Sequence, residues 1–113
     1  MKLCDLIEKL SLEVKTPGAD LTREVTSGYV SDMLSDVIAN ANAGSVWVTF
    51  QSHLNIVAVA SLKGISGIIL VNNRVPADDT LKKASMENIP IMTSSLSAFE
   101  LVGRLYTLGL RCR

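Results

Sequence analysis

Charged residues are scarce in this sequence, and the two signs balance. Asp, Glu, Lys and Arg make up 19% of the 113 residues, whereas about 25% is usual for soluble domains. Eleven acidic and eleven basic residues cancel, so there is no net positive charge to attract the phosphates of a nucleic-acid backbone. We therefore expect no general nucleic-acid binding.

Cysteine is rare as well, and its placement excludes two kinds of site. Cys4 and Cys112 lie near opposite ends of the chain, without the CxxC spacing of a redox motif or a zinc site. We expect two reduced, structurally minor thiols and no bound metal, as in a cytoplasmic protein.

Long apolar runs are missing. Asp5, Glu8 and Lys9 interrupt residues 1–12, so these do not form the apolar region of a secretory signal. The longest stretch without a charged side chain, 37–62, contains too many polar residues to cross a membrane. A cytoplasmic location and no membrane partner are expected.

The usual catalytic motifs are absent too. The chain has no GxxxxGK[ST] phosphate loop, no GxGxxG turn, no GxSxG elbow and no HExxH helix. Kinase chemistry of the phosphate-loop type is therefore excluded. The prediction is a protein that is not an enzyme and has no resident cofactor.

What the sequence does contain is a regular alternation of two hydrophobic periods. Leu3, Leu6, Ile7 and Leu10 recur at helical spacing, and the run 45–50 is rich in β-branched and aromatic residues. Helices are predicted over 2–11, 31–42, 54–63, 76–86 and 97–108. Strands are predicted over 13–15, 24–29, 45–50, 67–71 and 89–93.

This alternation predicts the fold class. Apolar strands that alternate with helices through short connections favour a parallel sheet covered on both faces. We expect one domain over residues 1–113, of the three-layer α/β/α class with a mainly parallel sheet of four to five strands. The strand order stays open.

The large apolar side chains are expected in the core. Trp47, Phe50 and Phe99 lie inside apolar segments. In the last helix, the predicted inner stripe consists of Phe99, Val102, Leu105 and Tyr106.

Polar residues follow the predicted strands, at the edge where open parallel sheets bind ligands. They suggest a shallow anion pocket, with hydroxyls, helix N-termini and the charge of Arg74. The alternative is that caps and turns simply use these residue types. The candidate binding residues are Gly28, Asp32, Gln51, His53, Asn55, Asn72, Arg74 and Thr93.

His53 is the only histidine. It could act as a general base if a carboxylate oriented it, and Asp32 is the acid expected within reach. The competing interpretation is a capping or packing residue beside a helix start.

Five segments cover essentially the whole chain: REVTSGYVSDMLSDV (23–37), VWVTFQSHLNIVAVA (46–60), GIILVNNRVP, IPIMTSS and FELVGRLY. Together they resemble the DRTGG domain family. The name motif departs from the family pattern, because Thr22-Arg23 replaces Asp-Arg and Thr26-Ser27-Gly28 replaces Thr-Gly-Gly. The lost glycine restricts the backbone at Ser27, and the lost aspartate removes one carboxylate.

The resemblance implies a small α/β domain similar to the amino-terminal domain of HPr kinase/phosphorylase and to MurF-type domains. Such domains occur alone or fused to CBS pairs, pyrophosphatases and phosphotransacetylases, as regulatory or assembly modules. Stand-alone members are often encoded near iron hydrogenase components, and the resemblance therefore implies a hydrogenase-related or metabolic enzyme as a protein partner.

Three functions follow as hypotheses. The first is a non-catalytic regulatory or interaction module that works as a homodimer, because so small a domain leaves apolar surface uncovered. The alternative is a sensor that binds a nucleotide or other phosphate ester at the polar edge of the sheet. The third is an acid/base enzyme that uses His53 and Asp32.

Overall fold

The computed structural model describes residues 1–112 and contains the predicted alternation. The helices are α1 (Leu3–Leu10), α2 (Leu34–Asn40), α3 (Asn55–Lys63), α4 (Asp78–Glu87) and α5 (Ala98–Thr107). The strands are β1 (Glu13–Val14), β2 (Ser27–Val30), β3 (Ser45–Thr49), β4 (Gly67–Leu70) and β5 (Ile91–Thr93). No helix among these residues is long and apolar enough to cross a membrane.

The five strands form one sheet in the order β1-β5-β4-β3-β2. Strands β2 to β5 are parallel, and only β1 pairs antiparallel, with β5. Because each parallel strand lies beside the next one along the chain, the right-handed connections place α2, α3 and α4 on the same face. The parallel part of the sheet contains no reversal of strand order.

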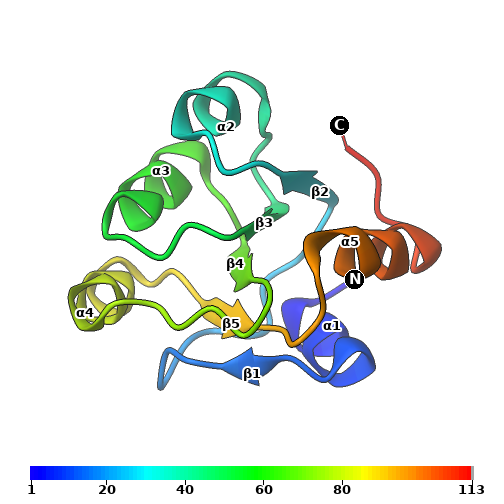
Figure 1. Ribbon diagram of the computed structural model, residues 1–113, viewed down its shortest axis with the longest axis horizontal. Coiled ribbons are helices and arrows are strands. Elements are labelled where there is room, and N and C mark those ends of the chain that lie inside the picture. The colour runs from blue at the N-terminus through cyan, green and yellow to red at the C-terminus, as the bar shows by residue number, and fades with distance from the viewer. Residues whose placement is uncertain (113) are drawn as a thin grey trace.

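Three layers result, as Figure 1 shows, with α2, α3 and α4 on one side of the sheet and α1 and α5 on the other. The sheet is covered on both faces, which explains why β3, β4 and β5 are buried along their whole length. The predicted three-layer α/β/α class is confirmed.

Alternate residues of the strands point into two separate cores. Trp47 and Ile68 pack with α2, α3 and α4, whereas Val46, Val48 and Ile69 pack with α1 and α5. The helix predicted over 54–63 is confirmed as α3, which buries one face and ends at Gly64 with a positive φ of 67°.

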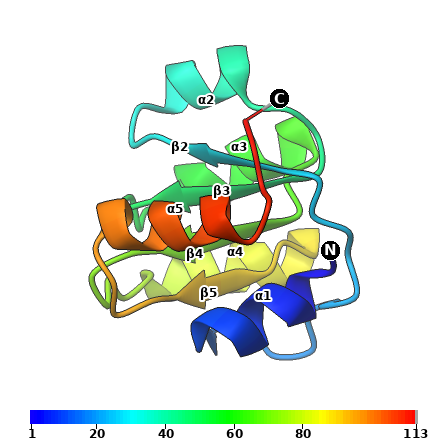
Figure 2. The ribbon, with the colours of Figure 1, turned by 90° about the vertical axis from the view of Figure 1, so that its right-hand side faces the viewer.

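The two edges of the sheet differ. Strand β1 forms one edge, and β2 forms the other. The backbone N–H of Gly28 in β2 donates to the carbonyl of Arg111 at 3.0 Å, so the tail after α5 contacts this edge. Figure 2 shows the tail passing in front of β2.

Some predicted boundaries are wrong by a few residues. Strand β2 begins at Ser27 instead of residue 24, and α2 begins at Leu34 instead of residue 31. The hydroxyl of Ser31 accepts the N–H of Met33 at 3.1 Å, which closes a local turn before the helix. Ser31 therefore shapes the connection and does not cap the helix.

Candidate functional site

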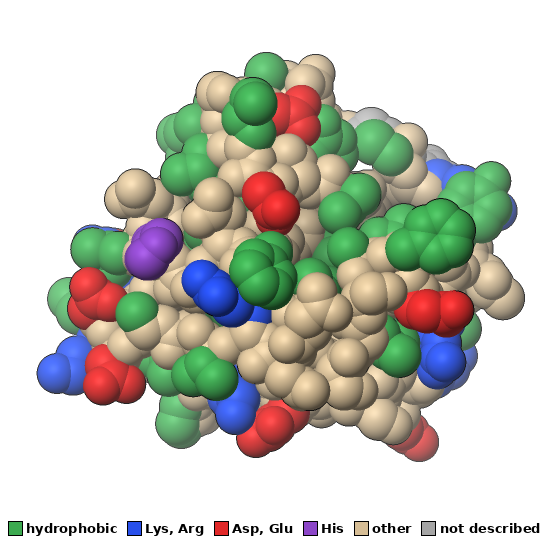
Figure 3. Space-filling view, in the orientation of Figure 1, with side chains coloured by type: hydrophobic (Ala, Val, Ile, Leu, Met, Phe, Trp, Pro, Cys, Tyr) green, Lys and Arg blue, Asp and Glu red, His purple; other side chains and the backbone are tan. Residues whose placement is uncertain are grey.

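Most of the predicted binding residues do gather at one edge of the sheet. Figure 3 looks onto the carboxyl ends of the parallel strands, where the connections to the helices lie. The residues that follow β2, β3 and β4 on this edge are Asp32, Gln51, His53, Asn55, Asn72 and Arg74. Their hydrogen bonds show what each one does there.

Asp32 links two neighbouring connections. Its carboxylate oxygen Oδ1 accepts the backbone N–H of Phe50 at 2.7 Å and the hydroxyl of Thr49 at 2.8 Å. The amide of Gln51 donates back to the carbonyl of Asp32 at 3.1 Å. Asp32 and Gln51 thus bind the loop after β2 to the loop after β3, which is a structural task.

Arg74 provides the positive charge on this edge. Its guanidinium lies 4.5 Å from the centre of the Phe50 ring, which is cation–π distance. No ion pair of Arg74 forms within residues 1–112. Phe50 was expected in the core, but it is 40% exposed, because it comes one residue after β3 has ended.

The turn that presents Arg74 is formed by two asparagines. Asn72 and Asn73 both adopt positive φ angles, of 55° and 54°. Their N–H groups donate to the carbonyls of Leu96 and Ser94, so the turn is fixed against the loop after β5. Asparagine tolerates this left-handed conformation better than most residues, which accounts for Asn72 without a ligand.

Two predicted binding residues do not lie on this surface. Gly28 lies within β2 and hydrogen-bonds to the tail, because the strand begins later than predicted. Thr93 is the last residue of β5 and is buried. Neither residue is open to a ligand at the carboxyl edge of the sheet.

His53 is exposed and lies to one side of this surface, at the left of Figure 3. Within residues 1–112 its ring makes no hydrogen bond, and none connects it to Asp32. The described residues also contain no cluster of three His, Cys, Asp or Glu side chains that could hold a metal. The geometry gives His53 no orienting carboxylate for general-base catalysis.

A different surface stands out on α5. Phe99 is 89% exposed and Tyr106 is 58% exposed, although both were expected to face the core. The buried residues of this helix are Leu101 and Leu105. The predicted inner stripe was right for Leu105, which is buried, and for Val102, which is partly buried against the core, but wrong for Phe99 and Tyr106. Helix α5 has two apolar stripes, and the one with the leucines faces the sheet.

The outer stripe of α5 borders an apolar groove. The groove has a volume of about 530 Å³ and lies between α5 and the end of β2. Its lining consists of Val30, Ala98, Phe99, Val102, Gly103 and Tyr106. We call this surface the α5 face; Figure 3 shows hydrophobic side chains gathered over α5 on the right of the molecule.

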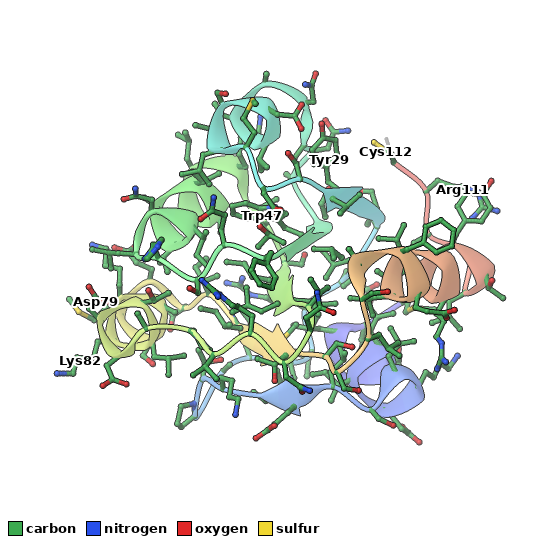
Figure 4. The ribbon with its side chains drawn as sticks, viewed as in Figure 1. Tyr29, Trp47, Asp79, Lys82, Arg111 and Cys112 are labelled. Atoms are coloured by element: carbon green, nitrogen blue, oxygen red, sulfur yellow. The ribbon has the colours of Figure 1, made fainter. Side chains whose placement is uncertain are left out.

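A second hollow continues the groove beneath the C-terminal tail. It has a volume of about 300 Å³ and shares Val30, Val102 and Tyr106 with the first. The Arg111 guanidinium lies 3.6 Å from the centre of the Tyr106 ring, so the tail closes this end. Figure 4 shows Arg111 and Cys112 on the tail beyond α5.

The charged groups on and beside α5 are largely paired. Glu100 and Arg104 are one turn apart, with 3.7 Å between carboxylate Oε2 and Nε. At the far side of β2, the hydroxyl of Tyr29 donates to Asp36 Oδ1 at 2.8 Å, which raises the pKa of Tyr29. Hydrogen bonds from Ser31, Tyr29 and Asn40 lower the pKa of Asp36 below its ordinary value of 3.8.

The α5 face could have been found from the sequence by counting both stripes. Phe99, Val102 and Tyr106 follow helical spacing, and so do Leu101, Leu105 and Leu108. A ten-residue helix at the margin of a sheet buries only one such stripe. Two stripes on one helix therefore predict an exposed apolar face.

Comparison with known proteins finds a similar fold in a solved structure but no match in sequence. No protein-family model matches the sequence, and no curated protein matches it. One similar crystal structure is described as the CBS and DRTGG domains of the regulatory region of Clostridium perfringens pyrophosphatase, complexed with its activator diadenosine tetraphosphate; the TM-score is 0.68 and the identity 17%. The match covers 97% of this chain and 47% of that one, so this chain spans about half of its length. The likeness supports a DRTGG-like fold, and family membership stays a prediction.

Proposed function

We propose that this chain is a non-catalytic regulatory module that works by binding protein through the α5 face. The observation that carries the proposal is the exposure of Phe99, at 89%, beside an apolar groove. Burying a phenylalanine side chain stabilises a contact by about 1.5–3 kcal/mol, so an exposed one next to a groove favours a protein interface.

Two further observations support this function. Asp32, the carboxylate on the carboxyl edge, accepts the side-chain hydroxyl of Thr49 in β3 and the backbone N–H of Phe50 after it, so it holds two connections of the fold together. The structurally similar protein is described as a regulatory region. We carry that role over to this chain as part of the proposal.

Site-specific photocrosslinking in cells tests the proposal. A benzophenone amino acid at position 99 should form protein adducts, whereas the same probe at position 86 should form few. Met86 is the matched control, because it is 77% exposed on α4, on the opposite face of the sheet. Equal yields at the two positions, or no adduct at position 99, would contradict the proposal.

A small-ligand sensor is the second candidate, and Arg74 favours it. An exposed guanidinium without a carboxylate partner in the described chain is suited to a phosphate group. Titration calorimetry with adenine nucleotides should then give heat that is lost in Arg74→Ala and kept in Lys82→Ala, a lysine on the distant helix α4. Absence of heat with every nucleotide would exclude this candidate.

A further inference from the structure

We propose that the partner of the α5 face is a second copy of this chain, packed through an antiparallel α5–α5 contact about a two-fold axis. This inference rests on the proposed function and adds the identity and geometry of the partner. It also assigns the homodimer expected from the sequence to one surface, the α5 face.

The outer stripe of α5 is symmetric along the helix. Phe99 and Tyr106 lie at its ends, and Val102 and Gly103 lie at its centre. The stripe is about 10 Å long at 1.5 Å per residue. A two-fold axis between positions 102 and 103 would bring each Phe99 against the Tyr106 of the other copy, and small residues against small residues.

Gly103 is the centre of this arrangement. It is exposed, and a Cβ placed there would meet nothing within 4 Å, so packing within the monomer does not require glycine. Glycine inside a helix is also the least favourable residue after proline. Its absent side chain would let a second backbone approach closely at this point of the stripe.

The charges of α5 agree with the same axis. Glu100 and Arg104 lie on either side of the centre. In an antiparallel pair, Glu100 of one copy would therefore lie near Arg104 of the other. The two charges of each face cancel, so two identical faces would attract each other through these opposite charges.

The size of the face sets the expected strength. Phe99, Tyr106 and Val30 together expose on the order of 400 Å² of surface, judged from the size of such side chains. A stable interface needs about 800 Å² from each partner. This face offers about half of that area, so the two copies should form a weak dimer that dissociates reversibly.

Sedimentation equilibrium of the purified chain under reducing conditions tests the inference. The apparent mass of the wild type should rise reversibly with protein concentration, from 12.2 kDa toward twice that value. Phe99→Ser removes an aromatic side chain from the contact and Gly103→Leu blocks its centre, so each should weaken dimerisation by about tenfold or more. Met86→Ser should have no effect.

Gly103→Leu separates an interface role from a folding role. The new side chain has open space in the monomer and a better helix propensity, so circular dichroism should show an equal or higher melting temperature while the dimer is lost. A wild type that stays monomeric, or equal weakening by Phe99→Ser and Met86→Ser, would overturn the inference. If position 99 then still crosslinked a different protein in cells, the proposed function would stand and only the second copy would be refuted.

Discussion

Asp32 shows at the scale of one residue why a candidate site can prove to be structure. Its carboxylate accepts two hydrogen bonds from residues at the end of β3, and its carbonyl accepts a third from Gln51. An acid that follows a parallel strand looks the same in sequence whether it meets a ligand or a neighbouring loop. Only the geometry distinguishes the two cases.

Replacing Asp32 should therefore affect stability. Asp32→Ala removes the acceptor for Phe50 and Thr49 and should lower the free energy of unfolding by about 1–2 kcal/mol, measured by urea denaturation. Asp32→Asn keeps a side-chain oxygen and should lose less. Equal stability of the alanine variant and the wild type would contradict the role of this carboxylate.

Asp36 gives the chain a small pH dependence. Its pKa is lowered by hydrogen bonds from Ser31, Tyr29 and Asn40, so its contribution to stability is present above the ordinary value of 3.8 and disappears as the pH falls through the lowered pKa. Asp36→Asn should melt below the wild type at neutral pH, and the difference should shrink in acid. A difference that grows in acid would have the wrong sign.

At the scale of elements, the sequence predicts the position of α5 correctly but not which of its faces is buried. The helix itself was predicted from the sequence, and in the structure the hydroxyl of Ser97 caps it by accepting the N–H of Glu100 at 3.4 Å. The assignment of Phe99 and Tyr106 to the core was wrong. Periodicity gives the stripes of a helix, but which stripe faces the sheet depends on the packing angle.

In the sheet, too, the strands themselves were predictable from the sequence but their order was not. The apolar runs that became β3 and β4 were predicted because burial on both faces leaves them almost free of polar residues. The order of the strands was not predictable, since alternation does not encode it. Consequently the edge position of β2, on which the α5 groove depends, came only from the structure.

The charges on α5 provide a test at this scale. Glu100→Arg alone and Arg104→Glu alone should each weaken the dimer, because like charges then face each other across the axis. The double exchange should restore association toward the wild-type level. Sedimentation of the four proteins checks this, and a double variant as weak as the singles would rule out the antiparallel arrangement.

At the scale of the whole molecule, the fold keeps its two large faces separate. Helices α2, α3 and α4 cover one side of the sheet, whereas α1 and α5 cover the other and leave the groove beside β2 open. Association at that groove should stabilise the fold by mass action. The melting temperature of the wild type should rise with protein concentration, whereas that of Phe99→Ser should stay constant in differential scanning calorimetry.

The most direct test of the two-fold contact is disulfide trapping at its centre. In a background with Cys4→Ser and Cys112→Ser, Val102→Cys should form a covalent dimer rapidly under mild oxidation, because the axis passes beside this residue and brings its two copies within disulfide reach. Met86→Cys, on the opposite face, should form a covalent dimer slowly. We expect faster trapping at position 102, and equal rates at positions 102 and 86 would refute the two-fold contact.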